Sequence, residues 1–269
     1  MRVTTRSAAF QQWAALGTNR GVRRRLGGFL VQGVGPIEAA VVHGWPLQTV
    51  LHRPGRLSAW AGGIIDRAAA AAVVEVAAPL LAELGGRDDG APELLAVVTI
   101  PGDDLDRITL VPPGLVVVAD RPASPGNLGS LVRSADGLGA AGVIVAGHAA
   151  DPYDAKAVRA SRGALFSVPV VRANGPGPVA AWLAASGLDP VALDEGGDVD
   201  LWAADLSGPV ALVVGNEASG LSAAWRELCT RSLRVPQSGG ASSLNAAVAG
   251  SLALYEVVRQ RARSERQNP

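Results

Sequence analysis

The sequence predicts an α/β fold built around a parallel sheet, for three reasons. Apolar runs rich in β-branched residues alternate with helical patterns along most of the 269 residues. One run, Ala211-Leu-Val-Val214, is apolar throughout, which is typical of a parallel strand covered on both faces. Two polar, glycine-bearing stretches, 215–220 and 235–245, follow such runs and precede helical patterns. Open α/β sheets bind ligands at these strand ends, so we expect a binding site there.

The composition excludes several classes of protein. With 48% apolar and 18% charged residues, the chain belongs with folded soluble proteins rather than disordered ones. Arg, Asp, Gly or Pro interrupts every apolar run before it reaches membrane-spanning length, and residues 1–10 hold no apolar signal core. The single cysteine, Cys229, suits a reducing compartment, so we expect a cytoplasmic protein without a disulfide. His43, His52 and His148 lie far apart, so we expect no metal site.

Positive charge is concentrated at the start of the chain, although the net charge is zero. Residues 1–57 contain eight arginines against one acid, Glu38. Such asymmetry favours an N-terminal part that faces a polyanion, and bidentate phosphate contacts suit arginine. A solvated surface in an arginine-rich protein is the alternative. The densest cluster comprises Arg20, Arg23, Arg24 and Arg25.

The pattern divides the chain into two α/β domains. In the first we expect helices at 10–26, 35–43, 64–71 and 79–84, and strands at 29–32, 47–51, 73–76 and 94–100. Residues 101–114, rich in Pro and Gly, form the best linker candidate. We therefore assign one domain to residues 1–106, a second to 114–262, and a frayed tail to 263–269.

The second domain alternates in the same way. We expect strands at 115–119, 143–146, 165–171, 190–193, 210–214 and 233–235, and helices at 128–137, 155–160, 179–185, 222–228 and 243–262. The last helix is amphipathic, with Leu244, Val248, Leu252 and Tyr255 along one face. Residues 137–142 spell the Gly-x-Gly-x-x-Gly dinucleotide fingerprint, but they end a helix and lead into a strand. A helix C-cap with a tight turn explains them better than a nicotinamide site.

Three polar stretches carry the chemistry. In Asn127-Leu-Gly-Ser-Leu-Val-Arg133, Asn127 is a plausible helix N-cap, and Gly129 leaves room on the face from which Arg133 reaches. An ordinary capped helix with an arginine on its surface would show the same residue pattern. In the second stretch, Glu217 is either a first-turn acid favoured by a helix dipole or part of a constrained ligand loop.

The third stretch, 235–245, is the most specific. Its strand ends at Pro236, Gly239-Gly240 frees the backbone, and Ser242 or Ser243 caps the long helix. Asn245 would then stand inside the first helical turn, where stability alone does not favour asparagine.

Together and in this order, the three stretches resemble the signature motifs of the SpoU (TrmH) family of RNA ribose 2′-O-methyltransferases, of the SPOUT class. The matching pattern is Asn-x-Gly-x-x-x-Arg, Gly-x-Glu-x-x-Gly, then Pro-x-x-Gly-x-x-Ser-Ser-Leu-Asn, within about residues 114 to 262. Residues 28–38 resemble the L7Ae/L30e-like substrate-binding domain that often precedes it. Two positions depart from the family pattern. Gln237 stands where Met is frequent, and Gly35 replaces the arginine of Gly-Val-Arg-Pro.

The resemblance implies a C-terminal α/β domain whose parallel sheet is threaded as a trefoil knot, a rare exception to unknotted chains. It also implies a homodimer, S-adenosylmethionine as cofactor and RNA, either rRNA or tRNA, as substrate. The cofactor would contact Val214, Gly215, Asn216, Val235 and Leu244. Arg133 would be the catalytic residue. The residues that surround Arg133, the ribose and the cofactor would be Asn127, Glu217, Ser243 and Asn245. The arginine cluster at 20–25 would bind the RNA.

Arginine stays protonated and is a poor base, so we expect Arg133 to orient the 2′-hydroxyl and a neighbouring phosphate and to stabilise the developing alkoxide. Proton abstraction by Arg133 is the other possibility. Two further functions compete with an RNA methyltransferase. One is a catalytically silent RNA-binding protein of the same fold, against which the complete set of motif residues argues. The other is a nucleotide-dependent oxidoreductase, which the misplaced glycine run weakens.

Overall fold

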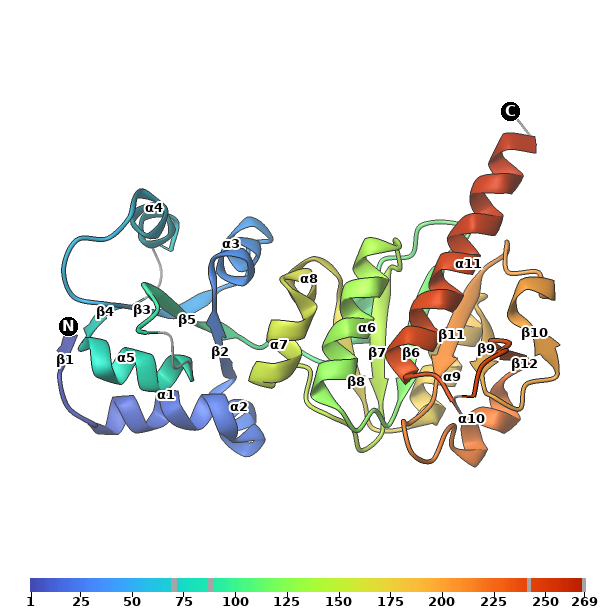
Figure 1. Ribbon diagram of the computed structural model, residues 1–269, viewed down its shortest axis with the longest axis horizontal. Coiled ribbons are helices and arrows are strands. Elements are labelled where there is room, and N and C mark those ends of the chain that lie inside the picture. Colours follow the sequence, from blue (N-terminus) through green and yellow to red (C-terminus); the bar gives the residue numbers. More distant parts are fainter. Residues whose placement is uncertain (69–71, 87–89, 241–242, 268–269) are drawn as a thin grey trace. The chain divides into compact units, whose positions relative to one another are not determined.

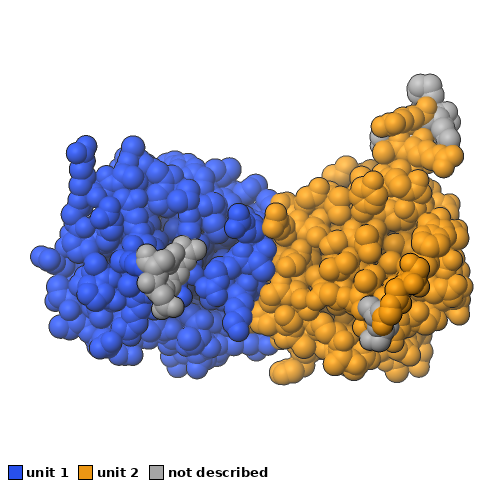
Figure 2. All heavy atoms as spheres, viewed as in Figure 1, with its two compact units in different colours: residues 1–101, 153–167 blue, residues 102–152, 168–269 orange. Residues whose placement is uncertain are grey.

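The computed structural model describes residues 1–68, 72–86, 90–240 and 243–267. The chain forms two compact units, coloured separately in Figure 2. Unit 1 comprises residues 1–101 and 153–167, and unit 2 comprises residues 102–152 and 168–269. Residues 153–167 therefore pack with the N-terminal unit, although they lie within the predicted second domain, 114–262. Aromatic contacts hold them there, since the ring of Phe29 lies 4.9 Å from that of Tyr153 and 6.1 Å from that of Phe166.

Unit 1 is built on a mixed five-stranded sheet. Its strands, in spatial order, are β1 (Arg2–Val3), β4 (Ala72–Val76), β3 (Leu47–His52), β5 (Leu94–Thr99) and β2 (Gly28–Gln32). Strand β5, which lies between β3 and β2, runs antiparallel to both of them. The helices of unit 1 are α1 (Ala8–Thr18), α2 (Arg20–Leu26), α3 (Val34–Val42), α4 (Ala59–Arg67), α5 (Ala78–Gly85), α7 (Ala155–Ser161) and α8 (Ala164–Ser167).

The predicted helix 10–26 is two helices, because Asn19 is extended and its side chain accepts a hydrogen bond from the Val22 N–H at the start of α2. The structure also corrects the prediction for Arg23, whose side chain is 2% exposed. Its guanidinium donates to the Leu16 carbonyl at 2.9 Å and lies 3.5 Å from the Asp154 carboxylate. Arg23 is therefore part of the interior of unit 1 rather than an RNA-facing residue, whereas Arg24 and Arg25 are exposed and Arg20 is half-buried.

Unit 2 contains the predicted parallel sheet. Its seven strands, in spatial order, are β10 (Val199–Asp200), β12 (Arg231–Arg234), β9 (Asp189–Leu193), β11 (Val210–Val214), β6 (Leu115–Asp120), β7 (Gly142–Ala146) and β8 (Val170–Ala173). Every neighbouring pair is parallel. The residues of β6, β7 and β11 are all buried, as continuous apolar runs predict for a sheet covered on both faces.

The remaining elements of unit 2 are α6 (Pro125–Gly137), α9 (Pro176–Ala185), α10 (Ala223–Leu228), α11 (Ala246–Gln267) and the 3₁₀ helices η1 (Leu105–Arg107) and η2 (Leu201–Ala203). The turn prediction for residues 137–142 is confirmed, since α6 ends at Gly137, Gly139 has φ +73°, and β7 begins at Gly142. The predicted strand 165–171 is wrong at its start. Residues 164–167 form α8, because a short apolar run does not distinguish helix from strand.

Helix α11 lies beside α6 in Figure 1 and approaches it closely at Gly250. A Cβ atom there would lie 2.6 Å from Leu131 Cδ1 and 3.3 Å from Val214 Cγ2. The buried face of α11 therefore includes Gly250, Ala253, Leu254 and Val257. Val248, Leu252 and Tyr255, the apolar face seen in the sequence, are instead 47%, 41% and 57% exposed. Among the described residues, no helix combines the length and apolarity needed to span a bilayer.

Candidate functional site

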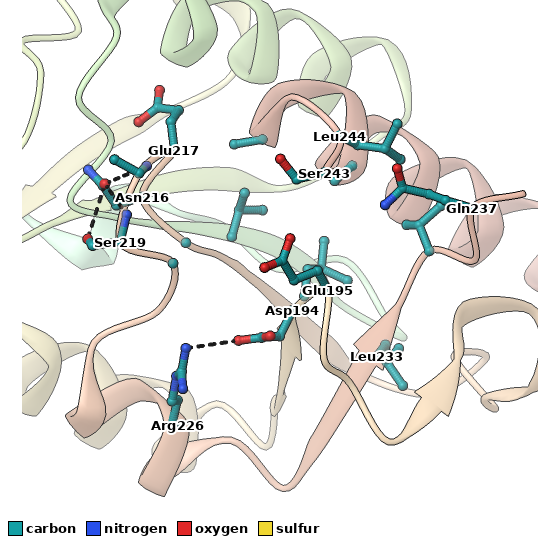
Figure 3. A pocket seen from close by; sticks show the side chains of 18 residues that line it. Asp194, Glu195, Asn216, Glu217, Ser219, Arg226, Leu233, Gln237, Ser243 and Leu244 are labelled. Carbon is teal, nitrogen blue, oxygen red and sulfur yellow. Dashed lines mark hydrogen bonds and ion pairs between the residues drawn. The ribbon is translucent and has the colours of Figure 1, made fainter. Parts of the chain in front are cut away.

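A pocket of about 350 Å³ lies in unit 2, where β9, β11 and β12 reach their carboxyl ends. This is the edge at which open α/β sheets bind ligands. The five predicted cofactor contacts all line it, namely Val214, Gly215, Asn216, Val235 and Leu244. Glu217, Ser243 and Gln237 line it as well, and Figure 3 shows their side chains around the same hollow.

The loop after β11 is closed so tightly that its first residue must be glycine. A Cβ atom on Gly215 would lie 2.6 Å from the carbonyl carbon of Gly220 and 2.7 Å from the Leu221 nitrogen. Asn216 and Gly220 exchange two backbone hydrogen bonds across the loop, of 3.0 and 2.9 Å. The glycines therefore bring bare backbone to the pocket wall, where its N–H and C=O groups can face a ligand.

The Asn216 side chain holds this loop together. Its Oδ1 accepts from the N–H groups of Ala218 and Ser219 at 2.9 and 3.0 Å. Its Nδ2 donates to the Arg121 carbonyl at 2.7 Å. Asn216 thus contributes to the pocket chiefly by fixing the shape of the loop.

Glu217 connects this loop to the start of α6. Its carboxylate accepts from the N–H of Ala123 at 2.8 Å, from the N–H of Ser124 at 3.1 Å and from Nδ2 of Asn127 at 2.9 Å. Burial alone would raise the pKa of Glu217, but these hydrogen bonds outweigh it and hold the pKa below its ordinary value. Glu217 is therefore an ionised anchor. It serves the segment that precedes α6 and is not an acid in the first turn of its own helix.

Two asparagines extend this connection to α11. Nδ2 of Asn245 donates to Oδ1 of Asn127 at 2.9 Å, and Nδ2 of Asn127 donates to Glu217. The chain Asn245–Asn127–Glu217 thus joins all three motif stretches, whose members stand 90 and 118 residues apart in sequence. We call this chain of side chains the polar bridge.

Both capping predictions are wrong. Ser124 caps α6, since its Oγ accepts from the Asn127 N–H at 3.3 Å, and Asn127 stands within the first turn. Asn245 precedes α11 and caps it, because its Oδ1 accepts from the N–H groups of Ala247 and Val248 at 2.9 and 3.3 Å. Ser243, the other described candidate, lies outside the helix and is exposed, and Ser242 lies outside the described residues. Asparagine at 245 therefore agrees with helix stability.

Arg133 lies on the exposed surface of α6, two turns beyond the start of the helix. Within the described part of the chain it forms no hydrogen bond or ion pair, and it does not line the pocket. The structure therefore brings together Asn127, Glu217 and Asn245, and leaves the guanidinium of Arg133 available to an external group.

Sequence reasoning missed the acidic wall of the pocket, formed by residues after β9. Asp194 and Glu195 both line it, and Asp194 forms an ion pair of 3.3 Å with Arg226 (Figure 3). The Asp194–Gly197 turn is closed by a backbone hydrogen bond of 3.0 Å and packs directly on β12, since a Cβ atom on Gly197 would lie 2.5 Å from the carbonyl carbon of Leu233. The signal was available. These residues follow a predicted parallel strand at its carboxyl end, as the recognised motifs do.

Two other chemistries find little support here. Burial, reinforced by the carboxylates of Asp189 and Asp120, raises the pKa of the Cys229 thiol to about 12, so it does not supply a thiolate at neutral pH. Within the described ranges, no three His, Cys, Asp or Glu side chains gather in a way that could hold a metal ion.

Residues 114–255 match the profile of the SpoU rRNA Methylase family, and residues 7–96 match that of the SpoU L30e-like domain. Among curated proteins, a 23S rRNA (uridine(2479)-2′-O)-methyltransferase of Streptomyces viridochromogenes is 52% identical over 266 residues, 97% of this chain and 92% of that protein. An uncharacterised tRNA/rRNA methyltransferase of Mycobacterium avium (strain 104) is 39% identical over 60% of this chain and 52% of its own.

Solved structures show the same similarity. The SpoU methyltransferase AviRb from Streptomyces viridochromogenes, in complex with AdoMet, has a TM-score of 0.91 and 51% identity, covering 96% of this chain and 99% of its own. An AdoMet-bound rRNA methyltransferase from Sinorhizobium meliloti has a TM-score of 0.88 and 29% identity, covering 96% and 97%. The similarity thus extends over both units.

Proposed function

The chain belongs to the SpoU rRNA methylase family, and from that premise we propose that it methylates the ribose of a uridine in 23S ribosomal RNA. Its reaction class is S-adenosylmethionine-dependent transfer of a methyl group to a ribose 2′-hydroxyl of RNA. The observation that carries the function is the polar bridge, which joins the three motif stretches beside a pocket at the carboxyl edge of the sheet. The uridine target is supported by the Streptomyces viridochromogenes relative, a 23S rRNA (uridine(2479)-2′-O)-methyltransferase that is similar along nearly the whole chain.

The residues of the unit 2 pocket fit S-adenosylmethionine. Its volume of about 350 Å³ lies in the range of small-molecule sites, and the glycine loop presents bare backbone. Val214, Val235 and Leu244 offer apolar contacts for the adenine, with Gly215 and Asn216 supplying the loop. The exposed carboxylate of Glu195 suits a ligand that carries positive charge. When bound, the cofactor supplies an activated methyl group on a sulfonium.

In this proposal Arg133 contacts the RNA directly. Its guanidinium is exposed and without a partner among the described residues, so it can donate to the ribose oxygen and a neighbouring phosphate. A group that remains protonated stabilises the developing alkoxide rather than removing the proton. Asn127, Glu217 and Asn245 position the start of α6, the helix that carries Arg133 two turns further on, and Ser243 borders the pocket.

We assign substrate binding to residues 1–106 and methyl transfer to residues 114–262. The exposed Arg24 and Arg25, with Arg20, are the proposed RNA contacts of the first part. The exposed apolar face of α11 favours a homodimer, because a solvated surface gains nothing from such a stripe. We also infer a cytoplasmic enzyme whose C-terminal segment is threaded as the trefoil knot of its class.

The test is methyl transfer from labelled S-adenosylmethionine to 23S rRNA, followed by mapping of the modified ribose. We expect transfer to a single uridine and none to tRNA. In Arg133→Ala, transfer should fall at least a hundredfold while calorimetry gives an unchanged affinity for the cofactor. Loss of cofactor affinity in this variant would contradict the role given to Arg133, and transfer to tRNA alone would contradict the proposed substrate.

A further inference from the structure

Unit 1 contains a second pocket, of about 520 Å³, which the proposed reaction does not use. Helices α1, α5 and α7 and strand β2 form its walls. The walls are mainly apolar, with Ala14, Leu30, Leu84 and Val158 among the lining residues. A hollow of this size and character accommodates a flat, largely apolar ligand.

One buried hydrogen-bond acceptor borders this unit 1 pocket. Oε1 of Gln32 is inaccessible to solvent and has no hydrogen-bond partner among the described residues. Gly85 packs beside this oxygen, since a Cβ atom there would lie 3.5 Å from Oε1 and 3.2 Å from the ring of Pro92. A buried acceptor without a partner favours a ligand that donates an N–H.

The rim of the unit 1 pocket carries one unneutralised charge. Arg159 lines the pocket, is exposed and has no ion-pair partner in the described ranges. Glu83, the lining carboxylate, is already paired with Arg6 at 2.8 Å. The pocket therefore offers a cation at its edge, which suits an anionic group attached to the flat ligand.

More positive charge lies on the neighbouring helix. The ion pair of Arg23 with Asp154 ties α2 to the start of α7, the helix that carries Arg159. Arg24 and Arg25 on α2 are exposed. A hollow with apolar walls, a buried acceptor and a cationic border matches the three parts of a nucleotide, namely base faces, base N–H and phosphate.

We propose that the unit 1 pocket receives a nucleobase of the RNA substrate that has turned out of its stack, while Arg159 contacts the phosphate of that nucleotide. Unstacked bases in RNA loops are commonly recognised by contact with their faces and by hydrogen bonds to their edges. The pocket would thereby anchor the RNA on unit 1. This inference rests on the proposed function only in taking RNA as the substrate.

Gly17 gives a direct test, because it lines the pocket and a side chain there meets no atom within 4 Å of its Cβ. Leucine is a better helix former than glycine, so Gly17→Leu should fill the hollow without weakening α1. Gly62→Leu on α4 is the matched control, since Gly62 also meets nothing within 4 Å and does not line the pocket. We expect the Kd for a 23S rRNA fragment to rise at least tenfold in Gly17→Leu and to stay unchanged in the control.

Two further variants probe the polar groups. Gln32→Leu should weaken RNA binding about fivefold without lowering Tm, because it removes an acceptor that has no partner in the free protein. Arg159→Ala should lower the slope of log Kd against log salt by about one, the change expected for one phosphate contact. All variants should bind S-adenosylmethionine like the wild type.

The outcomes separate this inference from the proposed function. If the wild type methylates 23S rRNA and Gly17→Leu binds that RNA equally well, the nucleobase pocket is wrong and the function stands. If the wild type methylates no RNA but Gly17→Leu still weakens RNA binding, the function fails and the pocket stands. Calorimetry with nucleoside 5′-monophosphates forms the last arm. If Gly17→Leu abolishes the binding of these nucleotides but leaves the affinity for RNA unchanged, the pocket belongs to free nucleotides and the RNA proposal is overturned.

Discussion

Asn245 performs two functions with one amide group. Its Oδ1 caps α11, while its Nδ2 donates to Asn127 in the polar bridge. Asn245→Asp keeps an oxygen for the cap but loses the donor, whereas Asn245→Ala loses both. We therefore expect Asn245→Ala to lower the unfolding free energy by about 1 kcal/mol, and Asn245→Asp to change it little. Methyl transfer should fall at least tenfold in both. Urea unfolding and initial rates measure the two effects, and full activity in Asn245→Asp would show that the bridge is not needed.

The lowered pKa of Glu217 predicts that the unfolding free energy depends on pH. Its pKa in the folded protein lies below the ordinary value, because three hydrogen bonds to the ionised form outweigh its burial. Its contribution is therefore fully present above the ordinary pKa and is lost as pH falls through the lowered folded value. At neutral pH, Glu217→Gln should lower the unfolding free energy by about 1 kcal/mol, a figure reduced for solvent screening because the carboxylate is only partly desolvated.

The difference in unfolding free energy between the wild type and Glu217→Gln should become smaller at about pH 4 and below, because protonation removes the same charge from the wild type. Urea unfolding of both proteins across this range measures it. A difference in unfolding free energy that stays constant from neutral to acid pH would mean that the charge of Glu217 contributes nothing to stability.

At the scale of elements, the loop after β11 tolerates no side chain at its first position. The Cβ atom of Gly215→Ala would clash with backbone, which cannot move aside as a flexible side chain can. We expect a loss of about 1–3 kcal/mol in unfolding free energy and at least a tenfold weaker affinity for S-adenosylmethionine. Gly208→Ala is the control, since a Cβ atom there meets nothing within 4 Å. Calorimetry that found normal cofactor binding in Gly215→Ala would place the cofactor away from this loop.

Strands and motif positions could be predicted because both depend on local pattern. The bounds of β11 agree with the sequence prediction, and those of β6 differ by one residue. The two-residue strands β1 and β10 were missed, since they are too short to show alternation. Capping was misread at Asn245, because the pattern that marks a helix does not fix its first residue.

At the scale of the whole molecule, the errors share one cause. The burial of Arg23 and the packing of residues 153–167 with unit 1 depend on contacts between segments more than 100 residues apart. The sequence shows that several arginines lie close together, but it does not show which of them the folded protein buries. Glu195 was missed although it follows a predicted strand at its carboxyl end, because it belongs to none of the three polar stretches.

The exposed face of α11 shows the same limit and leads to a prediction about assembly. The sequence shows an apolar stripe of Val248, Leu252 and Tyr255, while a single chain covers the opposite face of the helix. If a second copy covers this stripe, Leu252→Glu places a charge in the interface. We expect the dimer dissociation constant to rise at least a hundredfold, about 2.7 kcal/mol.

Sedimentation equilibrium of wild type and Leu252→Glu measures this change, with circular dichroism to confirm that the variant is folded. Val111→Glu is the control, because Val111 is exposed on unit 2 but lies outside α11. A wild type that stays monomeric at every concentration, or a dimer whose dissociation constant does not change in Leu252→Glu, would contradict the assignment.

Methyl transfer by the monomeric variant then decides whether dimerisation only stabilises the fold. Activity that falls with the dimer fraction, at unchanged cofactor affinity, would mean that each active site needs the partner subunit.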